Sequence, residues 1–512
     1  MMATTQIDTS LLMSHLRGCV PQSAKLSADS RQIQAGDIFF AYPVGHGNDF
    51  RDGRLYIKDA LTNGAAAVVY DPAGMNDELS ENPSCFPVDQ LAKLVGGLCA
   101  EWYGYPSKTL QVIGVTGTNG KTSVAYWLAQ TLNHALHPVA MLGTLGTGFL
   151  GKLVPTGYTT PDAPQIQTLL KEFVLAGAKQ VVMEVSSHAL DQNRINGVDM
   201  NCAVFTNLSQ DHLDYHGTMA EYAQVKAGLF QHPGLKHAVI NLDDSFGREL
   251  AIQLLVKDSV QVWAYALDEK AFAGFEKFGD RLQRVFAKNY VSTASGYKAV
   301  FHYEKCAPQQ VHLPVLGEFN LSNCLAVWTV LLTQKISVEQ ASKKMALLHA
   351  VPGRMELMKL HDSDPLVVVD YAHTPDALKK SLLALRPLAE QRGGKIWCVF
   401  GCGGDRDTSK RSQMGAITQE FANQVVITSD NPRSEEPETI IAMIHAGMAT
   451  DSQQIHTIVD RAAAIMFAVR GADSKDIVLV AGKGHESTQE IQGKKFAFSD
   501  QEHILLAAGG RA

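Results

Sequence analysis

The chain has 512 residues and 46% of them are apolar, which is enough for about three domains of ordinary size that each bury their own core. Its 45 lysine and arginine residues are outnumbered by 52 aspartate and glutamate residues, so the formal net charge is −7. This balance, without a basic cluster, argues against a large nucleic-acid footprint or a polybasic membrane patch, but it allows a nucleotide bound through a few chosen groups.

The start of the chain and its cysteines indicate the compartment. The first residues, MMATTQIDTSLLMSHLRG, lack a charged region followed by an apolar run and a cleavage site, and the chain has no apolar run long enough to span a membrane. The eight cysteines are scattered, which argues against a disulfide framework, and the close pair Cys398 and Cys402 lacks zinc-site spacing. We therefore expect a cytoplasmic protein with reduced thiols.

The stretch before the Gly-Tyr-Pro-Ser linker near position 106 mixes strands and helices, among them residues 37–42, 53–63 and 65–70. From residue 111 onward, short β-branched runs alternate with amphipathic stretches of helical length. Strands are predicted at 111–116, 180–185, 203–207 and 238–241, and helices at 123–134 and 219–231. This alternation indicates a parallel sheet with crossover helices. Between about 260 and 303, short alternating runs with Gly breaks predict an antiparallel addition.

A second alternating series follows the Val-Pro-Gly-Arg segment at 351–354, with strands predicted at 366–370, 395–401, 424–429 and 477–481. The predicted fold class is therefore α/β with three domains. They are a small mixed α/β domain at 1–106, a central P-loop ATPase-like parallel-sheet domain at 107–349, and a Rossmann-like α/β domain at 350–512.

The sequence GVTGTNGKT at 114–122 follows an apolar strand and opens a helix, as a phosphate-binding loop requires. Val115 occupies the place of the first glycine of the common GxxxxGK[ST] pattern, so the loop is the compact form from Gly117 to Thr122. Lys121 would act as a point charge and Thr122 would face Mg²⁺. The alternative is a chance glycine-rich turn.

Three further features point to a charged site near this loop. Glu184 continues a buried apolar strand, which is costly unless the carboxylate meets a cation, although it could also turn to solvent. His212 and His216 follow the next strand, and one of them is a candidate metal ligand, while the other would be structural. Lys226 lies in an apolar helical face between Tyr222 and Phe230, where it either extends to water or serves an active site as a cation or a modified lysine.

Polar clusters also follow the strands of the last domain. Asp430, Asn431 and Arg433 come after one strand, and Gly482 and Glu486 come after another. These charges match a zwitterion with carboxylates and amines. Arg406 follows a third strand, in a GCGGDR stretch too weak to indicate a dinucleotide site.

Taken together, these motifs resemble the Mur ligase family, ATP-dependent enzymes that add amino acids to the peptide of the bacterial cell-wall precursor. The resemblance covers the whole chain, through GTNGKT, MEVSSHAL (183–190), DHLDYHG (211–217), Lys226, GEFNLSN (317–323), VPGRME (351–356) and VDYAHTPD (369–376). DNPR (430–433) with GKGHE (482–486) points to a member that joins meso-diaminopimelate to UDP-N-acetylmuramoyl-L-alanyl-D-glutamate.

The resemblance implies a set of binding residues. The phosphates of ATP would meet Gly117, Thr118, Asn119, Gly120, Lys121, Thr122 and Ser123, and its adenosine end would meet Asn320, Asn323, Arg354 and Asp370. The UDP-sugar dipeptide would meet Ala28, Ser30, His46, Gly47, Asn48, Thr159, Thr160, Ser186, Gln192 and Arg194. The amino acid would meet Arg406, Asp430, Asn431, Pro432, Arg433, Gly482 and Glu486. Tyr158 departs from some members, which have a polar residue there, so a substrate contact from that position is not expected.

It also implies a chemistry. ATP would phosphorylate the D-glutamate side-chain carboxylate, and the incoming amine would displace phosphate from the acyl phosphate. Two Mg²⁺ ions would be held by Thr122, Glu184, His212 and a carbamylated Lys226, so that Lys121, Glu184, His212 and Lys226 form the catalytic group. The expected partners are the three small-molecule substrates, met by a monomer, with no nucleic acid and no membrane insertion.

Other functions remain open. A lysine-adding cell-wall ligase or a folate polyglutamate ligase would share the ATPase core and differ in the terminal domains. A non-catalytic nucleotide-binding regulator would lack metal or amino-acid residues, and a nucleic-acid motor is disfavoured by the charge balance.

Overall fold

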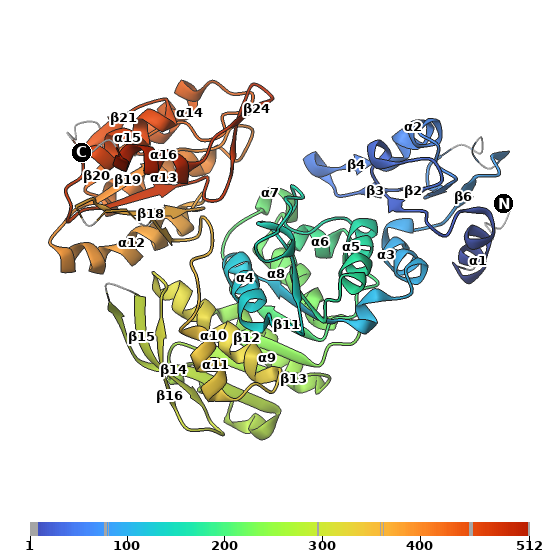
Figure 1. Ribbon diagram of the computed structural model, residues 1–512, viewed down its shortest axis with the longest axis horizontal. Coiled ribbons are helices and arrows are strands. Elements are labelled where there is room, and N and C mark those ends of the chain that lie inside the picture. The colour runs from blue at the N-terminus through green and yellow to red at the C-terminus, as the bar shows by residue number, and fades with distance from the viewer. Residues whose placement is uncertain are drawn as a thin grey trace. The chain divides into compact units, whose positions relative to one another are not determined.

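The computed structural model describes residues 9–75, 79, 81–293, 296–358, 360–361, 363–449 and 454–509, apart from the side chains of residues 9, 10 and 48. Contacts divide the chain into two compact units (Figure 1). Unit 1 consists of Met1–Ala264 and Gly274–Gln283, and unit 2 consists of Tyr265–Ala273 and Arg284–Ala512.

Unit 1 begins with a small parallel sheet in the order β1 (Leu26–Ser27), β2 (Ile38–Ala41), β5 (Ala67–Tyr70), β6 (Cys85–Pro87). Because side chains alternate along a strand, Phe40 joins the core under α1 (Thr9–Cys19) and α3 (Leu91–Trp102), whereas Phe39 joins the core that contains α2 (Ile57–Thr62). The antiparallel pair β3 (Pro43–Val44) and β4 (Arg51–Asp52) carries the loop with His46.

The second sheet of unit 1 carries the predicted phosphate loop. Its strands follow the order β12 (His237–Asn241), β11 (Cys202–Phe205), β7 (Gln111–Thr116), β10 (Gln180–Glu184), β8 (Val139–Gly143), β9 (Gly146–Phe149). All pairs are parallel except β8 with β9. In the register, Glu184 lies opposite Val115, and Phe205 lies opposite Thr116. The residues that follow β7, β10 and β11 therefore meet at one edge of the sheet.

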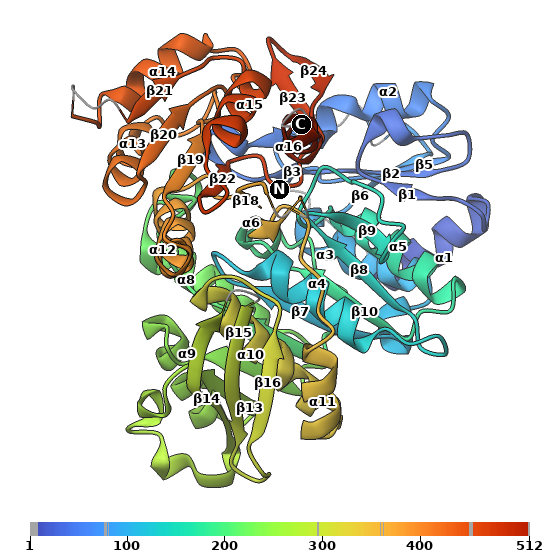
Figure 2. The ribbon, with the colours of Figure 1, turned by 60° about the vertical axis from the view of Figure 1, so that its left-hand side comes forward.

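Helices surround this sheet. Helix α4 packs on β8 and β10, and Figure 2 shows it running along these strands. The helical segments of this part are α4 (Lys121–Leu132), α5 (Ala163–Leu175), α6 (Ser187–Asp191), α7 (Leu213–His216), α8 (Met219–Ala227), the 3-10 helix η6 (Gly228–Gln231) and α9 (Ser245–Lys257), with β13 (Gln261–Ala266) after them.

Unit 2 contains an antiparallel group and a parallel sheet. The antiparallel strands are β14 (Leu282–Thr293), β15 (Gly296–Tyr303) and β16 (Gln309–Leu313), followed by α10 (Glu318–Thr333) and α11 (Val338–Met345). The parallel sheet has the order β17 (Glu356–Leu357), β18 (Leu366–Asp370), β22 (Ile477–Ala481), β19 (Ile396–Phe400), β20 (Gln424–Ile427), β21 (Ile455–Thr457), with β17 antiparallel at its edge.

Two helical layers cover this sheet, as in a doubly wound fold. One core contains side chains of α12 (Pro375–Arg392), α13 (Ser409–Phe421) and α14 (Pro437–His445), and the other contains side chains of α15 (Arg461–Gly471) and α16 (Asp500–Gly509). The hairpin of β23 (Thr488–Ile491) and β24 (Lys494–Ala497) follows β22 directly.

The predicted α/β class is confirmed, and so are the predicted strands, with small shifts at their ends. The antiparallel addition is confirmed by β14 and β15. The single helix predicted at 219–231 is wrong, because α8 ends at Ala227 and Gly228, a poor helix former, starts a 3-10 turn. The predicted helix at 123–134 begins two residues earlier, at Lys121, where Gly120 with φ 87° serves as the N-cap. The three domain bounds stay a prediction.

Across the residues described above, no helix combines the length and apolarity needed to cross a membrane.

Candidate active site

Residues 117–122 connect β7 to α4 and form the predicted phosphate loop. Gly117 (φ 144°) and Gly120 (φ 87°) adopt backbone conformations that favour glycine, and a Cβ on Gly117 would collide with the Thr206 hydroxyl. These turns bring the chain from a buried strand directly to the N-terminus of a 12-residue helix. The N–H groups at a helix N-terminus are suited to an anion.

The loop is braced by the residues that follow β11. The Thr118 N–H donates to the Asn207 carbonyl oxygen (2.8 Å), and the Asn119 N–H donates to Asn207 Oδ1 (3.0 Å). Thr206 Oγ1 donates to the Asn119 carbonyl oxygen (2.6 Å). The sequence analysis missed Thr206 and Asn207, although their place directly after a predicted neighbouring strand is a usable signal.

Glu184 ends β10 and is fully buried. Its Oε2 accepts from Thr122 Oγ1 (2.9 Å) and Thr144 Oγ1 (3.2 Å), and its Oε1 accepts from the Thr144 N–H (2.8 Å). The alternative that this acid turns to solvent is therefore wrong. Hydroxyls and an N–H satisfy the buried carboxylate here, so burial alone does not require the cation that the sequence analysis invoked.

The donor set at this point fits magnesium. Mg²⁺ takes oxygen ligands, binds few side chains and keeps waters and substrate phosphates as its other ligands. A threonine hydroxyl and a carboxylate, 2.9 Å apart beside a phosphate loop, supply such ligands. Over the described ranges, histidine, cysteine and acidic side chains do not gather in groups of three or more that could hold a metal ion. Thr122 and Glu184 thus suit an ion shared with a nucleotide.

Lys226 is buried, with 1% of its surface exposed, so the alternative that it extends to water is wrong. Its Nζ donates to the Gly117 carbonyl oxygen (2.9 Å) and lies 4.5 Å from the centroid of the Tyr222 ring. Phe230, its other aromatic neighbour in the sequence, is buried in η6. Burial, and then the charge of Lys121, hold the pKa of Lys226 well below its ordinary value.

Lys121 shares that carbonyl group. Its Nζ donates to the carbonyl oxygens of Gly117 and Thr118, both at 2.8 Å, so its side chain folds back over the loop. The Gly117 carbonyl oxygen thus accepts from two lysines, and the Lys121 ammonium places positive charge where phosphates are predicted to bind.

The two candidate histidines differ in their surroundings. His216 is buried and its Nε2 lies 2.9 Å from Ser187 Oγ, which is a satisfied structural role. The His212 side chain is 47% exposed. The pKa of His212 is lowered by burial, with Asp211 opposing and Lys121 adding to the shift. Of the pair, His212 is the one with free access to a metal ion.

His188 joins these rings and was missed in the sequence analysis. Its ring lies 4.9 Å from that of His212, and burial, followed by the two neighbouring histidines, lowers the pKa of His188 to about 3. It is therefore neutral throughout the physiological range.

The residues predicted for the acceptor dipeptide are linked to Glu184. Thr160 Oγ1 donates to the Glu184 carbonyl oxygen (2.8 Å), and Arg194 donates to the carbonyl oxygen of Thr160 (2.8 Å) and to Oε1 of Gln192. The hydroxyls of Thr144 and Thr159 lie 3.0 Å apart. Ser186 caps α6. The structure brings Thr159, Thr160, Ser186, Gln192 and Arg194 together.

The predicted UDP-sugar residues lie in the first sheet region. His46 Nε2 is 2.6 Å from the Tyr215 carbonyl oxygen, and Gly47 begins the 3-10 helix η2 (Gly47–Asp49). Ala28 and Ser30 follow β1, and the side chain of Asn48 lies outside the described residues. A cavity of about 280 Å³ near His46 is lined by Pro43, Val44, Gly45, Phe50, Ala92, Asp191, Gln192 and Asn193.

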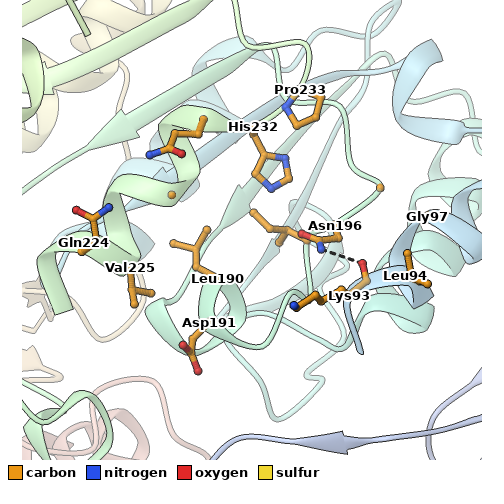
Figure 3. Close-up of a pocket in the computed structure, with 14 residues that line it drawn as sticks. Lys93, Leu94, Gly97, Leu190, Asp191, Asn196, Gln224, Val225, His232 and Pro233 are labelled. Atoms are coloured by element: carbon orange, nitrogen blue, oxygen red, sulfur yellow. Dashed lines mark hydrogen bonds between the residues drawn. The ribbon is translucent and has the colours of Figure 1, made fainter. Parts of the chain in front are cut away.

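A second cavity, of about 560 Å³, lies between α3, the end of α6 and the α8–η6 segment (Figure 3). Gln224 and Val225 line it from α8, and Asn196 donates to the Lys93 carbonyl oxygen at its rim (3.0 Å). The lining residues include none of the predicted phosphate, metal or substrate residues. This cavity is therefore not the predicted ATP site.

The residues predicted for adenosine lie in unit 2. Asp370 ends β18, where it accepts from the Met355 N–H (3.1 Å), and burial raises the pKa of its carboxyl. The Arg354 guanidinium lies 4.4 Å from the centroid of the Tyr371 ring. Asn323 Nδ2 donates to Asn320 Oδ1 (3.1 Å) within α10.

The amino-acid residues gather after β20 and β22. Asn431 Nδ2 donates to Glu486 Oε2 (2.8 Å), and a Cβ on Gly482 would lie 2.5 Å from Asp430 Oδ2. Burial raises the pKa of Asp430, with Arg461 and Lys483 opposing. Pro432 is buried beside them. The predicted cluster of Asp430, Asn431, Gly482 and Glu486 is confirmed as a spatial cluster.

The two predicted arginines flank Gly403. A Cβ on that glycine would lie 3.1 Å from Arg433 Nη1 and 3.9 Å from Arg406 Cγ. Arg433 Nη1 also donates to the Gly404 carbonyl oxygen (2.5 Å). The sequence analysis missed Arg411, whose guanidinium binds both Glu435 oxygens (2.7 and 2.8 Å) and joins the loop after β19 to the loop after β20.

Comparisons with known proteins agree with this fold. The family model described as the Mur ligase middle domain matches residues 115–331, and the model described as the Mur ligase, glutamate ligase domain matches residues 353–484. The chain therefore belongs to the Mur ligase family.

Individual relatives extend the match to nearly the full chain. The UDP-N-acetylmuramoyl-L-alanyl-D-glutamate–2,6-diaminopimelate ligase of Ralstonia nicotianae is 48% identical, over 98% of this chain and 96% of its own length. A solved structure with the same enzyme name is 34% identical, with a TM-score of 0.64 over 95% of this chain and 94% of that one. The MurF ligase from Thermotoga maritima in complex with ADP has a TM-score of 0.62 at 20% identity, over 96% of this chain and 98% of that one, and so shares the fold.

Proposed function

We propose that this chain is an ATP-dependent ligase that joins meso-diaminopimelate to the D-glutamate side-chain carboxylate of UDP-N-acetylmuramoyl-L-alanyl-D-glutamate, with release of ADP and phosphate. The names of the relatives support the substrates. The observation that carries the reaction is the placement of Glu184. Its carboxylate accepts from Thr122 of the phosphate loop and from Thr144, which lies 3.0 Å from Thr159, and its carbonyl group accepts from Thr160. A phosphate site and an acceptor site thus share one residue.

The chemistry follows from that adjacency. A carboxylate and an amine do not condense in water, so the acceptor carboxylate attacks the γ-phosphorus of ATP and ADP leaves. The amine of diaminopimelate then attacks the acyl phosphate, loses a proton and displaces phosphate. The N–H groups at the start of α4 and the Lys121 ammonium hold the phosphoryl oxygens and offset their charge. Arg194, held by Thr160 and Gln192, orients the acceptor.

Magnesium, when bound, neutralises charge on the transferred phosphoryl group. Thr122 and Glu184 would hold one ion. A second ion would be held by Glu184, His212 and a carbamate on Lys226. The low pKa of Lys226 supports this modification, because an unprotonated amine adds CO₂ and releases one proton to give the carbamate.

The choice of diaminopimelate rests on unit 2. Diaminopimelate carries one carboxylate more than lysine, so a selective site must offer that group a cation. Arg433 and Arg406 flank Gly403 beside the Asp430 and Glu486 carboxylates, a pattern of charges that suits both ends of a second amino-acid group. Asn320, Asn323, Arg354 and Asp370 stay the residues predicted for the adenosine end of ATP. We also expect the enzyme to act as a monomer in the cytoplasm.

Phosphate release with ATP, the UDP-sugar dipeptide and a panel of amino acids tests the proposal. We expect turnover with meso-diaminopimelate and a kcat/KM for lysine lower by roughly four orders of magnitude, because the polar groups of a selective site lose the partner that the second carboxylate supplies. Comparable values for the two would indicate a lysine-adding ligase. Turnover only with a folate and glutamate would indicate a folate ligase, and ATP binding without any turnover would indicate a regulator.

A further inference from the structure

Lys483 is a buried lysine in the loop after β22, outside the residues assigned so far. Its side chain has no exposed surface, and its Nζ donates to Glu486 Oε2 (2.9 Å), Asn431 Oδ1 (3.1 Å) and the Thr488 carbonyl oxygen (2.7 Å). An ammonium has three donors, and each of these is used on a different segment. Lys483 thereby joins the loop after β20, the loop after β22 and the hairpin strand β23.

These bonds fix the Asn431 side chain. Its Oδ1 accepts from Lys483 and from the Glu490 N–H (3.0 Å), and its Nδ2 donates to Glu486 Oε2 (2.8 Å). Rotating the amide by half a turn would set donors against donors, so this orientation is required. The loop therefore holds the Asn431 amide through its Oδ1 and one of its two Nδ2 hydrogens. A direct contact of Asn431 with the amino acid stays a prediction.

Glu486 remains available to a ligand. Its Oε2 takes both internal bonds, while its side chain is 31% exposed. Asp430 lies nearby, and without a cation the two carboxylates would repel each other. An ammonium buried between the loops fixes the direction in which Glu486 presents its carboxylate.

We propose that Lys483 is a positioning residue for amino-acid recognition, holding Glu486 and Asn431 in the geometry that receives an amino group of the incoming diamino acid. The inference rests on the proposed function and deepens it. Lys483 acts through its neighbours and makes no contact with the substrate itself.

The test measures kcat and KM for each substrate in Lys483→Met, with Lys495→Met, an exposed lysine of β24, as the matched control. We expect the KM for meso-diaminopimelate to rise by about tenfold or more in Lys483→Met, because hydrogen bonds to a charged group are lost. The KM values for ATP and the UDP-sugar dipeptide should stay within about twofold, since those residues keep their contacts. Lys495→Met should match the wild type in all three.

Two further variants separate positioning from stability. Lys483→Arg keeps a buried cation and should recover thermal stability. The planar guanidinium cannot donate to the same three acceptors, so the KM for diaminopimelate should stay raised. This variant carries the test if Lys483→Met does not fold. Adding Glu486→Gln to Lys483→Met should raise that KM less than the two single effects combined, because the lysine acts through the glutamate.

The outcomes are distinguishable. A wild-type enzyme that uses diaminopimelate, with unchanged KM for it in Lys483→Met, overturns the role of Lys483 and leaves the ligase standing. Equal changes in KM for all three substrates, or full recovery of KM in Lys483→Arg along with stability, also overturn it. A wild-type protein that neither binds nor uses diaminopimelate overturns both proposals.

Discussion

Two lysines are buried at the predicted sites, and they differ in the groups that they contact. Lys483 in unit 2 is bonded to a carboxylate, an amide and a carbonyl group. Lys226 in unit 1 contacts the Gly117 carbonyl group and the Tyr222 ring, and among the described residues it forms no ion pair with a carboxylate. Burying an ammonium costs several kcal/mol unless it is paired with a carboxylate. Lys483 is therefore suited to a structural role, whereas Lys226 is not.

The difference teaches what each region does. A paired buried charge fixes geometry, as needed to select one amino acid. A buried lysine without a carboxylate partner has a lowered pKa, and an unprotonated amine is what the carbamate proposed for Lys226 would require. We therefore expect changes in unit 1 to affect turnover with every amino acid, and changes in unit 2 to affect mainly the choice among them.

Lys121→Ala should have the largest effect. It removes a cation from the phosphate loop, so ligase activity should fall by about a hundredfold or more while the fold is kept. Phosphate release measures the activity, and thermal unfolding shows whether the fold is kept. Turnover near the wild-type rate would mean that residues 117–122 do not bind the phosphates of ATP.

Lys226→Ala should also lower turnover by about a hundredfold, with every amino acid alike, because a metal ligand is lost. Acetate or propionate should restore part of the activity by supplying a carboxylate in the space left by the side chain. Lys257→Ala, an exposed lysine of α9, is the control. An unmodified ammonium paired to a carboxylate in an experimental map of the wild type, with CO₂ present, would contradict the carbamate.

Arg433→Ala should act on selection alone. Loss of a bidentate cation should lower kcat/KM for meso-diaminopimelate by about tenfold to a hundredfold and leave the KM values for ATP and the UDP-sugar dipeptide unchanged. Arg386→Ala, exposed on α12, serves as the control. A uniform loss for all substrates would remove Arg433 from the amino-acid site.

The sequence was sufficient for the fold class and for most of the site, because parallel strands bring the residues at their carboxyl ends to one edge. Gly117, Thr122 and Glu184 could be found in this way. Residues that hold neighbouring loops in place could not be found from the sequence. Nothing in the sequence distinguishes Lys483 or Arg411 from a solvent-exposed lysine or arginine. The choice between His212 and His216 also needed coordinates, because it depends on Ser187, which lies in a different helix.

The helix that carries Lys226 shows the same limit. Its apolar positions at 222, 225, 229 and 230 predicted one continuous helix, but periodicity does not say where a glycine ends it. Val225, one of these apolar positions, is partly exposed and lines the larger cavity. The sequence left two alternatives open for Lys226, extension to water or a place in an active site, and only the coordinates show that the side chain is buried.

The smallest effect is on stability, and it compares the two lysines directly. Lys483→Met should lower the stability of unit 2 by about 1–3 kcal/mol, because Glu486, Asn431 and the Thr488 carbonyl oxygen each lose the hydrogen bond from the buried ammonium. Lys226→Met removes an unpaired buried charge and should leave unit 1 equally or more stable. Apparent melting temperatures, measured without CO₂, report both changes.

The gain in stability of Lys226→Met over the wild type should depend on pH. The pKa of Lys226 is lower in the folded than in the unfolded chain, so between the two values the unfolded chain binds more protons and wild-type stability rises with pH. The free-energy penalty of burying the Lys226 ammonium is complete below the folded pKa, falls by about 1.4 kcal/mol per pH unit above it, and vanishes above the ordinary lysine pKa of about 10.4. The melting temperatures of Lys226→Met and wild type should therefore converge as pH rises, since all other groups are common to both. A constant difference between them across the pH range would show that Lys226 is charged in the fold, and the contrast with Lys483 would disappear.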